Sequence, residues 1–364
     1  MNRRAFLKAG TMIPAAAFLP PAAFSRQLPF SPQPEGWQVF EVTTRVELAS
    51  PSGVTRVWLP LPSVEGPAWV KPMGNLWSGN AGTMRVHRDG TYGAEMLFAE
   101  WRTGEPAPSV QVVSRFAVRD RAIDWSDRSG PARLDRATQR LYTQATELMP
   151  TDGIVRRTAR EACRGMRTDI EKARAIYDWI VDNTFRDPDT RGCGVGDIRF
   201  MLETGNLGGK CADLNALYVG LCRAVGIPAR DVYGVRVADS RFELRSLGKS
   251  GDISKAQHCR AEVFLAGYGW VPADPADVRK VVLEEQPGLT LQHPLVAQVR
   301  ERLFGAWETN WLPYNFAHDL SLPNSSGPKI GFLMYPQGET AEGRLDSLDP
   351  ENFRYRLTSR EFTA

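Results

Sequence analysis

The sequence predicts an α+β protein in which a small antiparallel β-sandwich precedes a domain that combines helices with an antiparallel sheet. Three observations predict this class. Apolar and polar residues alternate in strand-like segments across residues 36–122. The apolar period lengthens from two to about 3.6 near Leu134. Two alternating segments around residues 256–280 flank the turn sequence AGYG, which predicts a hairpin.

The predicted sandwich opens with the segment FEVTTRVEL, in which every second residue from Phe40 to Leu48 belongs on one buried face. The segments VTRVWLPLP from Val54, MRVHRDGTYGAEMLFAEW over 84–101 and VQVVSRFAV over 110–118 continue the strand pattern. This domain shows no clustered nucleophile, base or metal ligands. We interpret it as a scaffold or binding module.

The first 25 residues are predicted to be an export signal. Arg3, Arg4 and Lys8 precede a mildly apolar run that ends in small residues, and the order Arg-Arg-x-Phe-Leu-Lys is typical of twin-arginine export. The run over 9–24 is too short and too proline-rich to span a membrane. We therefore expect residues 26–35 to be a linker and the mature chain, without a membrane span, to be periplasmic or extracellular.

The charge of the chain is balanced once the predicted signal is removed. The sequence has 45 basic and 42 acidic residues, and three of the basic ones lie in the signal, which leaves 42 against 42. Such a balance gives no reason to expect a nucleic-acid partner. The five cysteines are odd in number and few for 364 residues, so no disulfide framework is indicated.

Residues 208–230, GGKCADLNALYVGLCRAVGIPAR, predict a helix that begins at Cys211 and ends near Gly226. Cys222 lies in the apolar stripe of this helix and is predicted to be a core residue. Cys211 follows two glycines at the first helical turn, where backbone N–H groups stabilise a thiolate. From this position alone, Cys211 is equally consistent with a nucleophile and with a packing residue.

A histidine and an aspartate further along the chain favour the nucleophile. His258 lies near the start of the first strand of the predicted hairpin and Asp274 near the end of the second, so the hairpin brings them together. The imidazole of His258 can then pair with a thiolate while Asp274 orients the ring. His318 has an acidic residue beside it only in sequence and is the weaker candidate for the base.

These segments resemble the transglutaminase-like superfamily of papain-type cysteine enzymes. The resemblance covers about residues 130–280 and rests on GGKCADLNALYVGLCRAVGIPAR followed by HCRAEVFLAGYGWVPADP. It implies a Cys-bearing helix packed on an antiparallel sheet that carries His and Asp, with Cys211 as the nucleophile, His258 as the base and acid, and Asp274 as the orienting carboxylate. The candidate substrate-binding residues are Asn206, Gly209, Arg260 and Trp270. Cys259 and Arg260 follow the histidine at positions where an aromatic residue is common in the family. The resemblance therefore does not predict which residues form the wall that faces the substrate.

The resemblance implies acyl transfer through a thioester, which needs no cofactor. A peptide or protein of the cell envelope is the expected substrate, and the acceptor is either water or an amine. Two alternatives remain: a binding protein that has kept the fold and lost turnover, and a metal site built from Cys193, Cys211, Cys259 and His258. The absence of a Cys-x-x-Cys pair argues against the metal site.

Residues 281–364 are predicted to form an extension packed on the core. The extension is rich in aromatic residues but lacks a clear helical period. Its aromatic residues either pack it onto the core or line a substrate groove; they are Trp307, Trp311, Tyr314 and Phe316. The sequence leaves the oligomeric state open.

Overall fold

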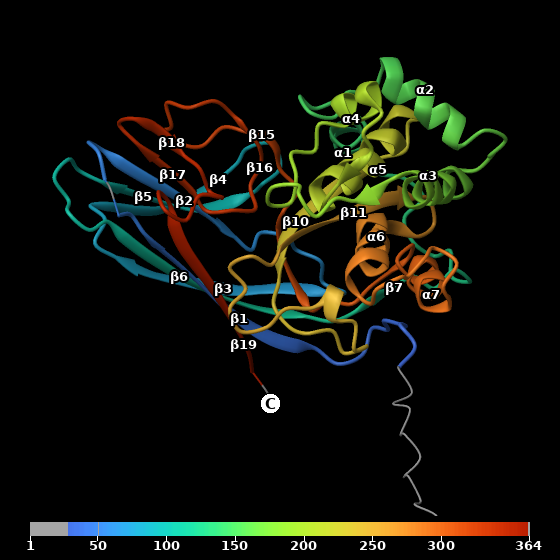
Figure 1. Cartoon of the computed structure of the whole chain (residues 1–364), viewed down its shortest axis with the longest axis horizontal. Helices are drawn as coiled ribbons and strands as arrows, with labels where there is room; N and C mark the ends of the chain where they lie inside the picture. The colour runs from blue at the N-terminus through green and yellow to red at the C-terminus, as the bar shows by residue number, and fades with distance from the viewer. Residues whose placement is uncertain (1–27, 50, 363–364) are drawn as a thin grey trace, which may run out of the picture.

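The computed structural model describes residues 28–49 and 51–362 and shows a β-sandwich beside a helix-rich region (Figure 1). The predicted export signal lies outside the described residues, as do the first two residues of the predicted linker. No helix within the described ranges is long and apolar enough to cross a membrane.

Two antiparallel sheets form the sandwich. The first has the strand order β19-β1-β6-β3 and the second the order β18-β17-β2-β5-β4. The strands of the first sheet are β1 (Gln38–Glu47), β3 (Val70–Gly79), β6 (Ser109–Val118) and β19 (Arg354–Phe362). Those of the second are β2 (Thr55–Leu61), β4 (Thr83–Arg88), β5 (Glu95–Trp101), β17 (Gln337–Thr340) and β18 (Gly343–Leu345).

The predicted pattern of the first strand is confirmed. Alternate residues from Phe40 to Leu48 are buried, while Arg45 and Glu47 between them are exposed. Side chains on successive strand residues point to opposite faces, so this alternation places one face of β1 in the core.

Strands from the C-terminal region complete both sheets of the sandwich. β19 pairs antiparallel with β1 from Val39 opposite Phe362 to Glu47 opposite Arg354, and β17 pairs with β2. The predicted sandwich over 36–122 therefore shares its sheets with residues of the predicted extension. In Figure 1 these C-terminal strands, coloured red, lie among the blue and cyan strands.

A third antiparallel sheet, with the strand order β12-β11-β10-β14, carries the helix-rich region. Its strands are β10 (Ala229–Arg236), β11 (Gln257–Leu265), β12 (Gly269–Ala273) and β14 (Trp311–Asn315). Helix α5 (Cys211–Ala224) packs on β10 and β11, and the described part of this region has six further helices (Figure 1). These helices are α1 (Arg136–Leu141), α2 (Gly153–Ala162), α3 (Asp169–Asn183), α4 (Ile198–Thr204), α6 (Pro275–Glu284) and α7 (Pro294–Arg302).

Short strand pairs join the two regions and the loops around α5. These are β7 (Arg121–Ala122) with β13 (Ala306–Trp307), β8 (Phe185–Arg186) with β9 (Gly208–Gly209), and β15 (His318–Leu320) with β16 (Ile330–Phe332). A 3₁₀ turn spans Arg245–Leu247.

The sandwich supports the third sheet, which contains β14, through shared aromatic packing. Trp69 of the sandwich region meets Trp307 edge to face at 5.9 Å between ring centroids, and Trp307 meets Trp311 of β14 at 5.7 Å. Trp307 and Trp311 are fully buried, as is Tyr314. These residues of the extension therefore pack the core, and burial excludes them as walls of an open groove.

The pairing of β19 with β1 leads to a stability prediction. Leu357 of β19 is buried in the core, so Leu357→Ala should lower the free energy of unfolding by about 2–5 kcal/mol. Arg360→Ala in the same strand removes an ion pair with Glu41 and a cation–π contact with Phe362, both made by an exposed side chain, and should cost about 1 kcal/mol. Urea unfolding of the two variants measures the difference, and equal stability would contradict the observed pairing.

Candidate active site

Cys211 is the first residue of α5 and follows the glycines of β9 directly. Asp213 accepts a hydrogen bond from the backbone N–H of Lys210 at 3.0 Å and so caps the start of the helix. A Cβ at Gly209 would lie 2.6 Å from the Cβ of Asp213, which explains the glycine at this position. The sulfur of Cys211 therefore lies at the N-terminal end of the helix, where backbone N–H groups favour a thiolate.

The predicted hairpin brings His258 and Asp274 together. His258 lies at the second position of β11, and Asp274 follows β12 directly as the N-cap of α6. The Nε2 atom of His258 lies 2.8 Å from Oδ2 of Asp274, and both side chains are buried. Because the carboxylate engages Nε2, Nδ1 is the ring nitrogen left for a thiol.

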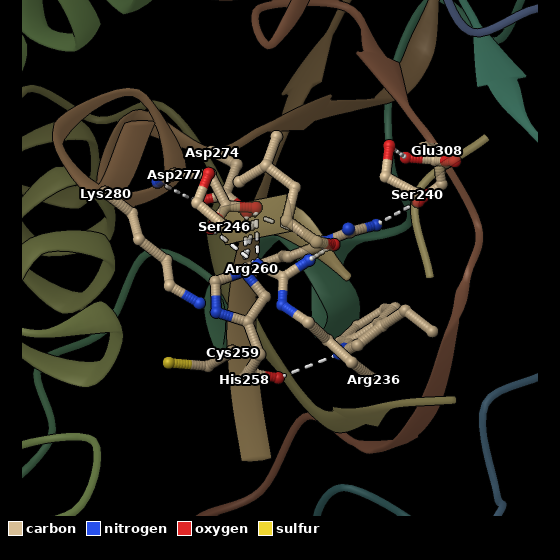
Figure 2. A network of polar contacts seen from close by, with 12 residues as sticks. Arg236, Ser240, Ser246, His258, Cys259, Arg260, Asp274, Asp277, Lys280 and Glu308 are labelled. Atoms are coloured by element: carbon tan, nitrogen blue, oxygen red, sulfur yellow. Dashed lines mark hydrogen bonds and ion pairs between the residues drawn. The ribbon is translucent and has the colours of Figure 1, made fainter. Parts of the chain in front are cut away.

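Asp277 is a second carboxylate beside the imidazole (Figure 2). Its Oδ2 lies 3.4 Å from Nε2 of His258, and Arg236 donates to its two oxygens at 2.6 and 2.7 Å. No role was predicted for Asp277 from the sequence, although its place three residues after Asp274 puts both acids at the first turn of α6. Its pairing with Arg236 depends on the tertiary fold.

Two further side chains hold the pair in position. Nδ2 of Asn215, one turn after Cys211 on α5, donates to Oδ1 of Asp274 at 3.2 Å and to the carbonyl oxygen of Cys259 at 2.8 Å. Nε1 of Trp311 donates to the carbonyl oxygen of His258 at 2.9 Å. These contacts tie the helix, the hairpin and β14 to one another at the site. Asn215 is not among the site residues predicted from the sequence.

The surrounding charges favour an ionised site. Burial and Arg236 act to lower the pKa of His258, but Asp277 and Asp274 outweigh them and raise it to about 9. Hydrogen bonds from Cys193 and Cys259, together with the charge of His258, overcome the effect of burial and hold the pKa of Cys211 well below its usual range. A thiolate and an imidazolium are therefore the expected states near neutral pH.

A loop covers the nucleophile. Cys211 is 3% exposed. The carbonyl oxygen of Cys193 accepts a hydrogen bond from the N–H of Ala212 at 2.9 Å, and the sulfur of Cys193 lies 3.2 Å from the carbonyl oxygen of Gln257. Oδ1 of Asp213 accepts the N–H groups of residues 195 and 196 at 2.9 Å each, which fastens the loop to the first turn of α5.

The structure places the four predicted substrate-binding residues in different surroundings. Gly209 lies beside the cap of α5, and Asn206 is exposed. Arg260 is buried, with Nε 3.5 Å from Oδ2 of Asp274 and Nη1 donating to the carbonyl oxygen of residue 308. Trp270 stacks on Arg230, whose guanidinium carbon lies 3.9 Å from the ring centroid. Their role in substrate binding stays a prediction.

The only group of side chains arranged to hold a metal within residues 28–49 and 51–362 consists of His258, Asp274 and Asp277. The set of Cys193, Cys211, Cys259 and His258 is not such a group. Because the guanidinium of Arg236 already occupies both oxygens of Asp277, a divalent cation would meet a like charge there. The local charges thus favour a hydrogen-bonding role for these carboxylates.

The low pKa of the Cys211 thiol predicts an unusual alkylation profile. Iodoacetamide should label Cys211 at pH values well below the ordinary thiol pKa of 9.0, because His258 and the neighbouring thiols stabilise the thiolate. In His258→Ala the pH midpoint should move upward. Cys222 on the same helix, whose pKa is raised by burial, should stay unlabelled and serves as the internal control.

Peptide mass spectrometry after short exposures at several pH values measures this profile. The covering loop slows labelling at every pH, but it does not move the midpoint, provided that the loop itself does not titrate. A midpoint near 9 in both wild type and His258→Ala would contradict the ionised pair.

Residues 156–275 match the transglutaminase-like superfamily. A Haemophilus influenzae protein described as uncharacterized is 33% identical over 343 residues, which cover 89% of this chain and 91% of the relative. A Cytophaga hutchinsonii structure described as a candidate cysteine protease has a TM-score of 0.51 at 16% identity and covers 90% of this chain and 99% of its own. The periplasmic domain of TgpA from Pseudomonas aeruginosa has a TM-score of 0.34 at 15% identity and covers 66% of this chain and 92% of that domain.

The similarity to the solved structures concerns the fold alone, whereas the Haemophilus relative spans nearly the whole chain. The matched family segment includes the helix of Cys211 and the hairpin that carries His258 and Asp274. This chain belongs to the transglutaminase-like superfamily.

Proposed function

We propose that this protein is an exported thiol enzyme that cleaves or exchanges amide bonds of peptides or proteins through a thioester on Cys211. The observation that carries the proposal is the imidazole of His258, whose Nε2 faces both Asp274 at 2.8 Å and Asp277 at 3.4 Å, beside the helix start of Cys211. Export rests on the twin-arginine pattern at the N-terminus.

Acylation begins when the Cys211 thiolate attacks an amide carbonyl carbon and the carbon–sulfur bond forms. Backbone N–H groups at the start of α5 stabilise the negative charge that develops on the carbonyl oxygen. The imidazolium of His258 then donates its proton to the leaving nitrogen as the carbon–nitrogen bond breaks. The products of this half are a free amine and a thioester on Cys211.

Deacylation runs the same steps with a new nucleophile. His258, now neutral, accepts a proton from water or from an amine as that group attacks the thioester carbon. The carbon–sulfur bond breaks and the thiolate returns. Water gives a peptidase or amidase, and an amine gives acyl transfer.

The covering loop has to move before the full site is available. The N–H of Ala212, which lies at the helix start and suits an oxyanion, donates to the carbonyl oxygen of Cys193 at 2.9 Å. Release of this hydrogen bond frees the N–H group and exposes the sulfur of Cys211 in one movement. The described conformation therefore corresponds to a closed state.

The same closure is the observation that favours the alternative, a binding protein without turnover. The sulfur of Cys211 is almost fully buried under Cys193. Against the alternative stands the intact set of Cys211, His258 and Asp274, because a site that has lost turnover has no chemical need for all three residues.

The proposal is tested with a proteolytic digest of bacterial envelope proteins, incubated with the mature chain and hydroxylamine as an amine acceptor. Mass spectrometry should detect cleaved peptides or hydroxamates. Cys211→Ala and His258→Ala should lower the rate by about 10³-fold or more. Asp274→Asn should lower it less, because Asp277 still contacts the imidazole.

Cys222→Ala is the matched control, since it truncates a buried thiol on the same helix away from the reacting atoms. It should leave the turnover of folded protein unchanged. Product formation that persists in Cys211→Ala would refute the mechanism. The absence of product in wild type that still carries a reactive Cys211 thiolate would favour the binding protein.

A further inference from the structure

Three buried thiols meet at the start of α5, and the mechanism above uses only one of them. The thiols of Cys193 and Cys259 each donate a hydrogen bond to the sulfur of Cys211, and all three side chains are buried. A disulfide would bring two of these sulfur atoms to about 2.05 Å from each other. The backbone that carries one of them has to move for such a bond to form.

Cys259 has little freedom to move. It lies in β11 directly opposite Tyr233 of β10, inside an unbroken antiparallel register. Nδ2 of Asn215 also holds its carbonyl oxygen at 2.8 Å. A shift of Cys259 would break hydrogen bonds of a fully buried strand, which is costly because buried backbone groups need partners. The fold therefore disfavours a disulfide between Cys211 and Cys259.

Cys193 lies in the covering loop, outside any helix or strand. Its neighbours Gly192 and Gly194 have φ values of 57° and 92°, a left-handed backbone that glycine adopts without strain. Two hydrogen bonds of 2.9 Å fix its place, one from the N–H of Ala212 to its carbonyl oxygen and one from its own N–H to the hydroxyl of Tyr335. Cys193 is thus held against the nucleophile by a segment that can shift without breaking a sheet.

The two thiols differ in protonation. The sulfur of Cys211 is held as a thiolate, and the thiolate is the form that reacts with peroxides. The contact with Cys211, together with burial, raises the pKa of Cys193, so this thiol keeps its proton. A reactive thiolate beside a protonated thiol is the usual pairing of a peroxide-sensitive cysteine with the cysteine that attacks its oxidised sulfur.

We propose that Cys193 forms a reversible disulfide with Cys211 after a peroxide has oxidised the nucleophile, and that this bond locks the covering loop over the site. The inference rests on the proposed function in one respect, because Cys211 must be the reactive thiolate that becomes accessible when the loop opens. It goes beyond that function because it assigns a modification site and a residue, Cys193, that protects the nucleophile from further oxidation.

The reaction has two steps, with hydrogen peroxide as the oxidant. With the loop open, the Cys211 thiolate attacks a peroxide oxygen, the sulfur–oxygen bond forms and the oxygen–oxygen bond breaks. The hydroxide that leaves takes the proton of the His258 imidazolium and becomes water, so the sulfur is oxidised to a sulfenic acid and the peroxide is reduced. When the loop closes, the sulfur of Cys193 attacks that of Cys211. The sulfur–sulfur bond forms, the sulfur–oxygen bond breaks, and the hydroxyl group leaves with the Cys193 proton as a second water.

The mature chain, first reduced and then treated with an equimolar amount of hydrogen peroxide, tests this pair. N-ethylmaleimide blocks the remaining thiols during unfolding, and trypsin then releases the three cysteines on separate peptides, residues 192–199, 211–223 and 256–260. Mass spectrometry should find 192–199 linked to 211–223. Because Cys222 shares a peptide with Cys211, Cys222→Ala is the matched background, and the link should form in it unchanged.

Two further variants separate the candidate partners of Cys211. Cys193→Ser keeps a hydrogen-bond donor but cannot form the disulfide, so peroxide should carry Cys211 on to the sulfinic acid. Dithiothreitol should then restore iodoacetamide labelling of Cys211 in wild type, and this restoration should be lost in Cys193→Ser. Cys259→Ala should form the same link as wild type.

A link between 211–223 and 256–260, or a sulfinic acid on wild-type Cys211 without any link, would overturn the role of Cys193. Both results come from the wild-type chain, so they do not depend on how a variant folds. A wild-type chain that forms no link but keeps His258-dependent iodoacetamide labelling of Cys211 would remove the disulfide alone and leave the proposed function standing. A link in a chain that fails the hydroxylamine assay after reduction would do the reverse.

Discussion

The charge balance around His258 is the constraint on which the site depends. The Nε2 atom of its imidazole faces both Asp274 and Asp277, and Arg236 and Arg260 approach the same two carboxylates. With the thiolate of Cys211, three negative groups meet three positive groups in a region almost closed to water. A buried charge is costly unless it is paired, so removal of one member leaves its partner uncompensated. The same pairing keeps the thiol ionised.

The fold serves this balance by fastening separate elements to one another. Asn215 connects the nucleophile helix with Asp274, and Trp311 connects β14 with the backbone of His258. The sandwich contacts the sheet of β14 through the packing of Trp69 on Trp307 and of Trp307 on Trp311, and β19 pairs with β1 in the sandwich. A site that depends on exact charge positions benefits from such a rigid surrounding.

The features that were predictable from the sequence depend on local patterns. The features that were not predictable depend on pairing between distant residues. The helix from Cys211 and the hairpin that joins His258 to Asp274 follow from periodicity and turn residues close in sequence. Arg236 meets Asp277 only after the sheet has formed, and β19 reaches β1 across more than 300 residues. The loop over Cys211 shows no apolar period, because the hydrogen bonds of its backbone to Ala212 and to the Asp213 carboxylate hold it in place of apolar packing. The predicted signal lies outside the described residues.

The protonation state of His258 decides whether the site holds a buried ion pair. NMR of ¹⁵N-labelled histidine follows the protonation of each ring, and a His258→Gln variant assigns its signal. We expect His258 to stay an imidazolium through neutral pH and to titrate near the pKa of about 9, and we expect Asp277→Asn to lower this value. A His258 that titrates near the ordinary 6.5 or below, unaffected by Asp277→Asn, would contradict the ionised pair.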